Sequence, residues 1–164
     1  MPDIAWLSDI TEIKLFGTKF YICSIEDIFS RYVISYTILP TNDSALVANT
    51  FMDAYTKRNP PYGLIFHSDN GANFTATAIR ALLKPYGIRQ SFSRIATPQD
   101  NGHMESFFAT LKKEELYRKT YHSPEDFFQS VKEYIEYYNN SRLHSRLGYK
   151  TPKEVLDEYD EKHK

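Results

Sequence analysis

The sequence predicts an α/β fold whose elements follow the order βββαβαβααα. Three observations lead to this class. Apolar runs rich in β-branched and aromatic residues dominate the first part of the chain, apolar residues recur at helical spacing later, and turn or capping residues separate these segments. A chain of 164 residues can bury a substantial core, so we expect residues 1–164 to form a single domain.

The first part of the chain is predicted to be mainly strands, at residues 4–13, 20–25, 31–38 and 63–66. The short connections between the first three strands favour an antiparallel meander. Asp43 or Ser44 can cap a helix that precedes the fourth strand. That fourth strand delivers Asp69 just past its end, where Asn70-Gly71 turns the chain.

The second part is predicted to be mainly helical, with helices at residues 75–84, after Asp100, after Ser123 and after Thr151, and one strand at residues 88–93. The composition of residues 94–99 suggests a mobile loop. Asp100 is expected to cap the helix that carries Glu105, and Thr151 to start a capping box. We expect residues 142–164 to be a C-terminal extension packed on the domain.

The composition excludes several classes of protein. With 41% hydrophobic and 25% charged residues, it is typical of a folded globular protein. The single cysteine, Cys23, excludes an intrachain disulfide and is expected to be buried. No apolar run approaches the length of a membrane span, and no signal-peptide pattern opens the chain, so we expect a cytoplasmic protein without a membrane partner.

The net charge of −1 hides an uneven distribution. Residues 1–79 carry 5 basic and 8 acidic groups, residues 80–150 carry 12 and 8, and residues 151–164 carry 3 and 5. The net positive middle segment could face a polyanion, and a solvated surface of mixed charge is an equally good alternative.

Three acids are the candidate site. Asp9 interrupts a strand-like run, Asp69 follows another, and 35 residues separate Asp69 from Glu105. On the predicted helix, Glu105 and Lys112 fall within about 20° of each other, roughly 10 Å apart along the axis. A glutamate at such a position is ordinarily only surface charge. Glu105 is a candidate site residue because the two aspartates accompany it.

Carboxylates that meet without a partner repel each other, and a divalent cation removes that conflict. A set of ligands that are all carboxylates suits Mg²⁺ or Mn²⁺, which also bind phosphate oxygens. Two such ions can activate a water or a 3′-hydroxyl and stabilise the leaving oxygen of a phosphodiester. The acids therefore predict phosphodiester chemistry on a nucleic acid. His67 and His103 could lie near this site, but ordinary polar or supporting roles are favoured over direct ligation.

Several segments carry a family resemblance: Trp6-Leu7-Ser8-Asp9-Ile10-Thr11, His67-Ser68-Asp69-Asn70-Gly71, Asp100-Asn101 before Glu105-Ser106-Phe107-Phe108 and Leu111-Lys112, and the tail Tyr138-Asn139-Asn140-Ser141-Arg142-Leu143-His144 with Leu147-Gly148-Tyr149-Lys150-Thr151-Pro152. Together they resemble the catalytic core of bacterial insertion-sequence transposases with a retroviral-integrase-like D-D-E domain. The resemblance implies a ribonuclease-H-like fold, with a five-stranded mixed sheet flanked by helices.

The resemblance also implies a function. Asp9, Asp69 and Glu105 would be the catalytic metal ligands of a polynucleotidyl transferase that uses two Mg²⁺ or Mn²⁺ ions, cleaves DNA at transposon ends and transfers the strand to target DNA. Such enzymes act as homo-oligomers on DNA, in the bacterial cytoplasm and associated with the nucleoid when active. A nuclease or resolvase that only hydrolyses, and a catalytically idle DNA-binding or assembly module, are the alternatives.

Five residues are expected to contact DNA by the same resemblance: Arg94, Lys112, Lys113, Arg142 and His144. For Arg142 and His144, structural support remains open beside DNA contact. Complete relatives carry an N-terminal helix-turn-helix region, whereas this chain begins eight residues before Asp9, so it looks like an excised core. Residues 102–104 also depart from the small apolar residues common in relatives.

Overall fold

The computed structural model describes residues 1–94 and 101–164. Apart from Arg94, the loop predicted to be mobile at residues 94–99 lies outside these ranges, and so does Asp100 with its predicted capping role.

The centre of the molecule is a mixed sheet with the strand order β3-β2-β1-β4-β5. The strands are β1 (Ala5–Leu15), β2 (Thr18–Asp27), β3 (Val33–Leu39), β4 (Ile65–Ser68) and β5 (Arg89–Phe92). The first three pair antiparallel, which confirms the predicted meander, and β4 pairs parallel with both β1 and β5. The parallel pairs need crossovers, and these are the helical segments between the strands.

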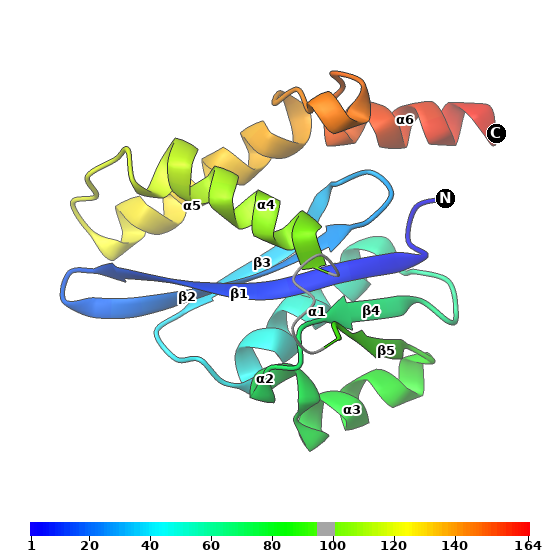
Figure 1. Ribbon diagram of the computed structural model, residues 1–164, viewed down its shortest axis with the longest axis horizontal. Coiled ribbons are helices and arrows are strands. Elements are labelled where there is room, and N and C mark those ends of the chain that lie inside the picture. The colour runs from blue at the N-terminus through cyan, green and yellow to red at the C-terminus, as the bar shows by residue number, and fades with distance from the viewer. Residues whose placement is uncertain (95–100) are drawn as a thin grey trace.

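Helices cover both faces of this sheet. They are α1 (Ser44–Arg58), α2 (Ala72–Thr75), α3 (Thr77–Leu83), η1 (Lys84–Tyr86), α4 (Gly102–Leu111), the π-helical η3 (Lys112–Leu116), α5 (Pro124–Asn140), η4 (Ser145–Leu147) and α6 (Pro152–Lys162). Figure 1 shows α4, α5 and α6 on one side of the sheet and α1, α2 and α3 on the other.

The alternation of side chains along β1, β2 and β3 places residues in a separate core on each face of the sheet. Leu7 and Ile22 pack toward α4 and α5, whereas their sequence neighbours Trp6 and Cys23 pack toward α1 and α3. Cys23 is a buried free thiol, as predicted. Because both sheet faces are covered, the strands read as nearly continuous apolar runs.

Helix starts follow the predicted caps. The side chain of Asp43 accepts hydrogen bonds from the amides of Ala45 and Leu46, and Thr151 forms a capping box with Glu154. No helix in the described ranges is both long and apolar enough to cross a membrane.

Two predicted boundaries differ from the structure. The helix predicted at residues 75–84 is observed mainly as α3, and it is separated from α2 at Ala76, whose ψ of 141° is extended, so that Phe74 and Ile79 can both enter the core. Arg31 does not begin β3 but adopts a φ of 63° in the turn before it. In addition, α4 passes into a π-helical turn at Lys112.

Candidate active site

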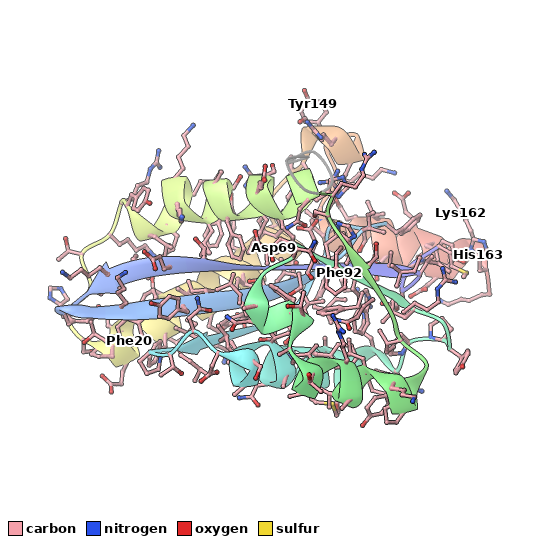
Figure 2. The ribbon with its side chains drawn as sticks, turned by 60° about the horizontal axis from the view of Figure 1, so that its bottom comes forward. Phe20, Asp69, Phe92, Tyr149, Lys162 and His163 are labelled. Atoms are coloured by element: carbon pink, nitrogen blue, oxygen red, sulfur yellow. The ribbon has the colours of Figure 1, made fainter. Side chains whose placement is uncertain are left out.

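Neighbouring strands bring Asp9 and Asp69 to the same cavity. In the parallel pair of β1 and β4, Leu7 lies opposite His67, where the pairing ends. Asp9 follows two residues later within β1, and Asp69 lies just after the end of β4. Asp9 shares the side of the sheet with Leu7, which is the side that α4 covers. Both aspartates line one cavity, and Figure 2 shows Asp69 near the middle of the molecule.

The turn after β4 holds the Asp69 side chain. Its Oδ1 accepts a hydrogen bond of 2.8 Å from the amide of Gly71. A Cβ at position 71 would lie 2.8 Å from the same oxygen, so only glycine allows this close approach without a shift. Asp69 itself is exposed, with its carboxylate oriented by the backbone.

Asp9 is half-buried, and its electrostatics report on its neighbours. The pKa of Asp9 is raised to about 6: burial raises it most, the charges of Asp69 and Glu105 also raise it, and a hydrogen bond from the Ile10 amide and the charge of Lys112 lower it. The three acids and Lys112 therefore lie within electrostatic range of one another. A carboxylate with a raised pKa among other carboxylates is typical of a functional site.

Glu105 approaches from the helix that covers Asp9. Its side chain is exposed in the first turn of α4, and Met104 and Phe107 anchor that turn in the core. Glu105 forms no hydrogen bond or ion pair with any residue in the described ranges, so its carboxylate is free to rotate. Its position on a shoulder of the apolar stripe is the predicted one.

A cavity of about 440 Å³ opens beside the aspartates. Asp9, Asp69, Gly71 and Asn73 line it, together with Ile10 on the edge of β1. Glu105 is not among its lining residues in the part of the chain that the structure describes.

The acids do not form a closed ligand shell as they stand. Within residues 1–94 and 101–164, no group of three or more His, Cys, Asp or Glu side chains is arranged to hold a metal ion. The donor chemistry nevertheless fits a hard divalent cation, because the neighbouring groups are carboxylates and the pKa of Asp9 is raised.

The predicted DNA-contacting residues fall into two groups. Lys112 is half-buried at the end of α4, close enough to lower the pKa of Asp9, and Lys113 and Arg94 are exposed. Arg142 instead makes a two-pronged ion pair with Glu114, at 2.7 Å for the closer contact. His144 packs edge-on against Tyr138, with ring centroids 4.6 Å apart.

Sequence reasoning missed several polar residues near the acids. The Asn73 side chain donates a hydrogen bond of 2.5 Å to Asn42, and both residues line the cavity beside Asp9. His67 binds the hydroxyls of Ser91 and Ser93 at 3.0 and 3.2 Å, which favours the supporting role expected for it. The pairing of Asn42 with Asn73 joins segments distant in sequence, and no local pattern signals it.

Comparison with known proteins matches most of the chain. The family described as Integrase core domain matches residues 1–98, and a second family of the same description matches residues 86–152. The transposase for insertion sequence element IS904 of Lactococcus lactis is 36% identical over 154 residues, which are 93% of this chain and 61% of that protein. The chain thus spans less than two thirds of the length of such curated relatives.

Solved structures show the same fold. The catalytic core of HTLV-2 integrase, solved in complex with magnesium in a trimeric form, has a TM-score of 0.74 and 21% identity, covering 94% of this chain and 97% of that one. A chain of the simian T-cell lymphotropic virus intasome has a TM-score of 0.80 and 19% identity, covering 94% of this chain and 54% of that one. The predicted ribonuclease-H-like fold, with its five-stranded mixed sheet, is confirmed.

Proposed function

The chain belongs to the integrase core domain family, and from that premise we propose that it is the catalytic part of a DNA transposase, with Asp9, Asp69 and Glu105 as its catalytic acids. The reaction we propose is cleavage at transposon ends followed by transfer of the freed strand to target DNA. The observation that carries this proposal is the convergence of Asp9 and Asp69 at the end of β4, with Glu105 in electrostatic range.

We propose that these three acids hold two divalent cations, Mg²⁺ or Mn²⁺. The exposed Glu105 side chain would turn toward the aspartates to complete the site, while Gly71 keeps Asp69 in place. Such ions supply activation of a water or a 3′-hydroxyl and neutralise the charge on the leaving oxygen. The relative solved with magnesium supports a divalent cation for this fold.

The chain's own residues supply binding and orientation. Lys112, on the same shoulder of α4 as Glu105, would hold a phosphate near the reacting bond, and Lys113 and Arg94 would extend the cationic surface. The ion pair of Arg142 with Glu114 supports a structural role for this arginine.

Assembly and organisation are part of the proposal. HTLV-2 integrase cores occur in dimeric and trimeric forms, which supports self-association of this chain on paired DNA ends, and with it association with the nucleoid. The packing of α6 against α5 supports a single domain in which residues 142–164 form a packed extension.

The test incubates the chain with Mn²⁺, end-labelled transposon-end duplexes and plasmid target. Joined products are expected from the wild type and none from Asp69→Asn. Asp53→Asn is the matched control, because Asp53 is an exposed acid on α1 paired only with Lys57. Nicking without joining would favour the hydrolytic alternative, and binding alone the idle module. Cleavage that survives Asp69→Asn unchanged would overturn the mechanism.

A further inference from the structure

A second cavity, of about 180 Å³, adjoins α4. Its lining contains cationic and imidazole groups from four segments of the chain: Arg31, His103, Arg142, His144 and Arg146. The hydroxyl-bearing residues Ser106 and Thr110 also line it, and no carboxylate does so within the described ranges. Such a lining has the composition of an anion site.

The cavity lies on the flank of α4 away from Glu105. At about 100° per residue, Ser106 is one step round the helix from Glu105, and His103 and Thr110 lie roughly 140–160° from it. Ala109 and Lys113 are exposed on the ridge between the two flanks. A strand of DNA that reacts at Glu105 can therefore cross a ridge roughly 10 Å wide and reach the cavity.

Two ring nitrogens at this cavity lack partners. The guanidinium of Arg31 lies 2.9 Å from Nε2 of His103. Because arginine only donates, Nε2 accepts and the proton of the neutral ring sits on Nδ1. That Nδ1 is buried and has no hydrogen-bond partner among the residues described. Nε2 of His144 is buried and unpartnered there as well. The backbone of Tyr138 takes the proton of the His144 ring, so the His103 nitrogen is the one of the two that can donate to an anion. Buried polar atoms of this kind ordinarily have a partner, so a ligand is the natural candidate.

The charge around the cavity is not balanced. Arg146 is exposed and forms no ion pair with any residue that the structure describes. Burial, and next the charge of Arg142, lowers the pKa of His144. Among the described residues, Arg142 is the one of the three arginines with a short ion pair, which it makes with Glu114.

Arg31 reaches the cavity from the turn between β2 and β3, where it adopts a φ of 63°. From there its guanidinium contacts the ring of His103.

The volume of the cavity indicates a small ligand. It is smaller than the roughly 300–1,000 Å³ of pockets that hold drug-sized molecules. A phosphate fits the available donors, because guanidinium, imidazole and hydroxyl groups are its usual partners in DNA complexes.

We propose that this cavity binds a backbone phosphate of the DNA strand on which the active site acts. The assignment rests on the proposed function, and it makes Arg31, His103 and Arg146 DNA-binding residues. A strand held at this point and at Lys112 would be fixed on both flanks of α4.

The test measures binding of a short fluorescent duplex by the full chain in EDTA, over a range of salt concentrations. Arg146→Ala is expected to weaken binding roughly 10-fold and to reduce the slope of log affinity against log salt by about 1. Arg146→Glu should weaken it further. Arg80→Ala, which removes an exposed arginine from α3 on the opposite face, should match the wild type.

A second arm titrates inorganic phosphate and follows the imidazole resonances of His103 and His144. Shifts in the wild type that are absent from Arg146→Glu support the site. Shifts without any effect of Arg146→Ala on DNA affinity would assign the cavity to free phosphate and overturn the assignment to DNA. Equal DNA binding by both Arg146 variants and Arg80→Ala overturns it as well. Failure of the proposed catalysis would be seen separately. The wild type would then give no joined products, although Arg146→Ala would still weaken DNA binding.

Discussion

Asp9 carries its charge at a cost to folding. Its pKa is raised to about 6, first by burial and then by the two other acids. Because the folded pKa lies above the ordinary value, the stability that Asp9 contributes is full at low pH and is lost as the pH rises through about 6. At neutral pH the ionised group therefore opposes folding, and the proposed cation would offset that cost.

Asp9→Asn should therefore stabilise the metal-free protein at neutral pH, by about 1–2 kcal/mol. Mn²⁺ should raise the melting temperature of the wild type and have little effect on the variant, and the wild-type shift should shrink below about pH 6 as Asp9 takes up a proton. Differential scanning fluorimetry with and without Mn²⁺ measures both effects. An equal Mn²⁺ shift in wild type and variant contradicts the ligand role of Asp9.

Glu26 is a second acid whose charge is unfavourable. It is fully buried, and its two carboxylate oxygens have no hydrogen-bond partner in the described part of the chain. Burial raises its pKa to about 8, with Asp27 adding to the rise and Arg31 opposing it. Its contribution to stability is present below about pH 4.5 and is lost progressively up to about pH 8.

Glu26→Gln should reduce this loss of folding stability with rising pH. Urea unfolding at about pH 5 and about pH 8 should give a wild type that is less stable at the higher pH and a variant with a smaller difference. Glu133→Gln, at an exposed position on α5, should behave like the wild type. If Glu26→Gln and Glu133→Gln show the same pH dependence, Glu26 is ionised in the folded state without cost.

At the scale of an element, Asn139 adds hydrogen bonds to the apolar packing of α5 on the sheet. The amide group of Asn139 accepts a hydrogen bond from the Val33 amide at 2.8 Å and donates one to the Val33 carbonyl at 2.9 Å. It thus satisfies both backbone groups at the start of β3, the outer strand of the sheet. The bonds explain why the family-like tail contains an asparagine at this position.

Asn139→Ala should cost about 2–4 kcal/mol of unfolding free energy, because two buried backbone groups lose their partners. The neighbouring Asn140 is exposed and bonds only within its own helix, so Asn140→Ala should cost less than about 0.5 kcal/mol. Urea unfolding of the two variants measures the difference. Similar losses for both would mean that water replaces Asn139 at β3.

Most elements could be predicted from sequence because their signals are local. The caps at Asp43, Ser123 and Thr151 are hydrogen bonds over two or three residues, and all three form. The conformation of Arg31 could not be predicted in this way, because its side chain contacts His103 across 72 residues. The burial of Glu26 was missed too, since its position at the end of β2 carries no local sign of burial.

The candidate acids could be chosen from sequence, but their contact could not. Their order and spacing led to the family, and the family match is confirmed. The meeting of Asp9 and Asp69 at one cavity depends on the parallel pairing of β1 and β4, which a sequence pattern does not encode. That Glu105 stands apart from the cavity lining is likewise a matter of helix placement, visible only in three dimensions.

At the scale of the whole molecule, the sheet lies between two hydrophobic cores and contributes side chains to both. Leu111 belongs to the core under α4 and α5, and Leu46 to the core under α1, and both are fully buried. Trp6, the one tryptophan, lies in the second core. Because β1, β2 and β3 each contribute to both cores, we expect the molecule to unfold as one unit.

Leu111→Ala should therefore lower stability by about 2–5 kcal/mol and shift the Trp6 fluorescence transition together with the circular dichroism transition. Leu46→Ala, on the tryptophan side, is the matched variant and should do the same. Denaturant titrations followed by both probes give the result. A Leu111→Ala protein whose fluorescence midpoint stays at the wild-type value would show that the two cores unfold separately.

The unequal lengths of β1 and β4 leave part of the central strand bordered on one side only. β1 runs to Leu15, while its pairing with β4 ends at Leu7. The Ile10 amide points to the side on which β4 no longer pairs, and it donates a hydrogen bond of 2.8 Å to the carboxylate of Asp9. By the strand's period of two, the amides of Glu12 and Lys14 point the same way without a strand beside them. Deuterium uptake should therefore alternate along β1, fast at the amides of Glu12 and Lys14 and slow at the amides that face β2. A nucleic acid bound in the cavity beside Asp9 would slow the exchange of the two fast amides.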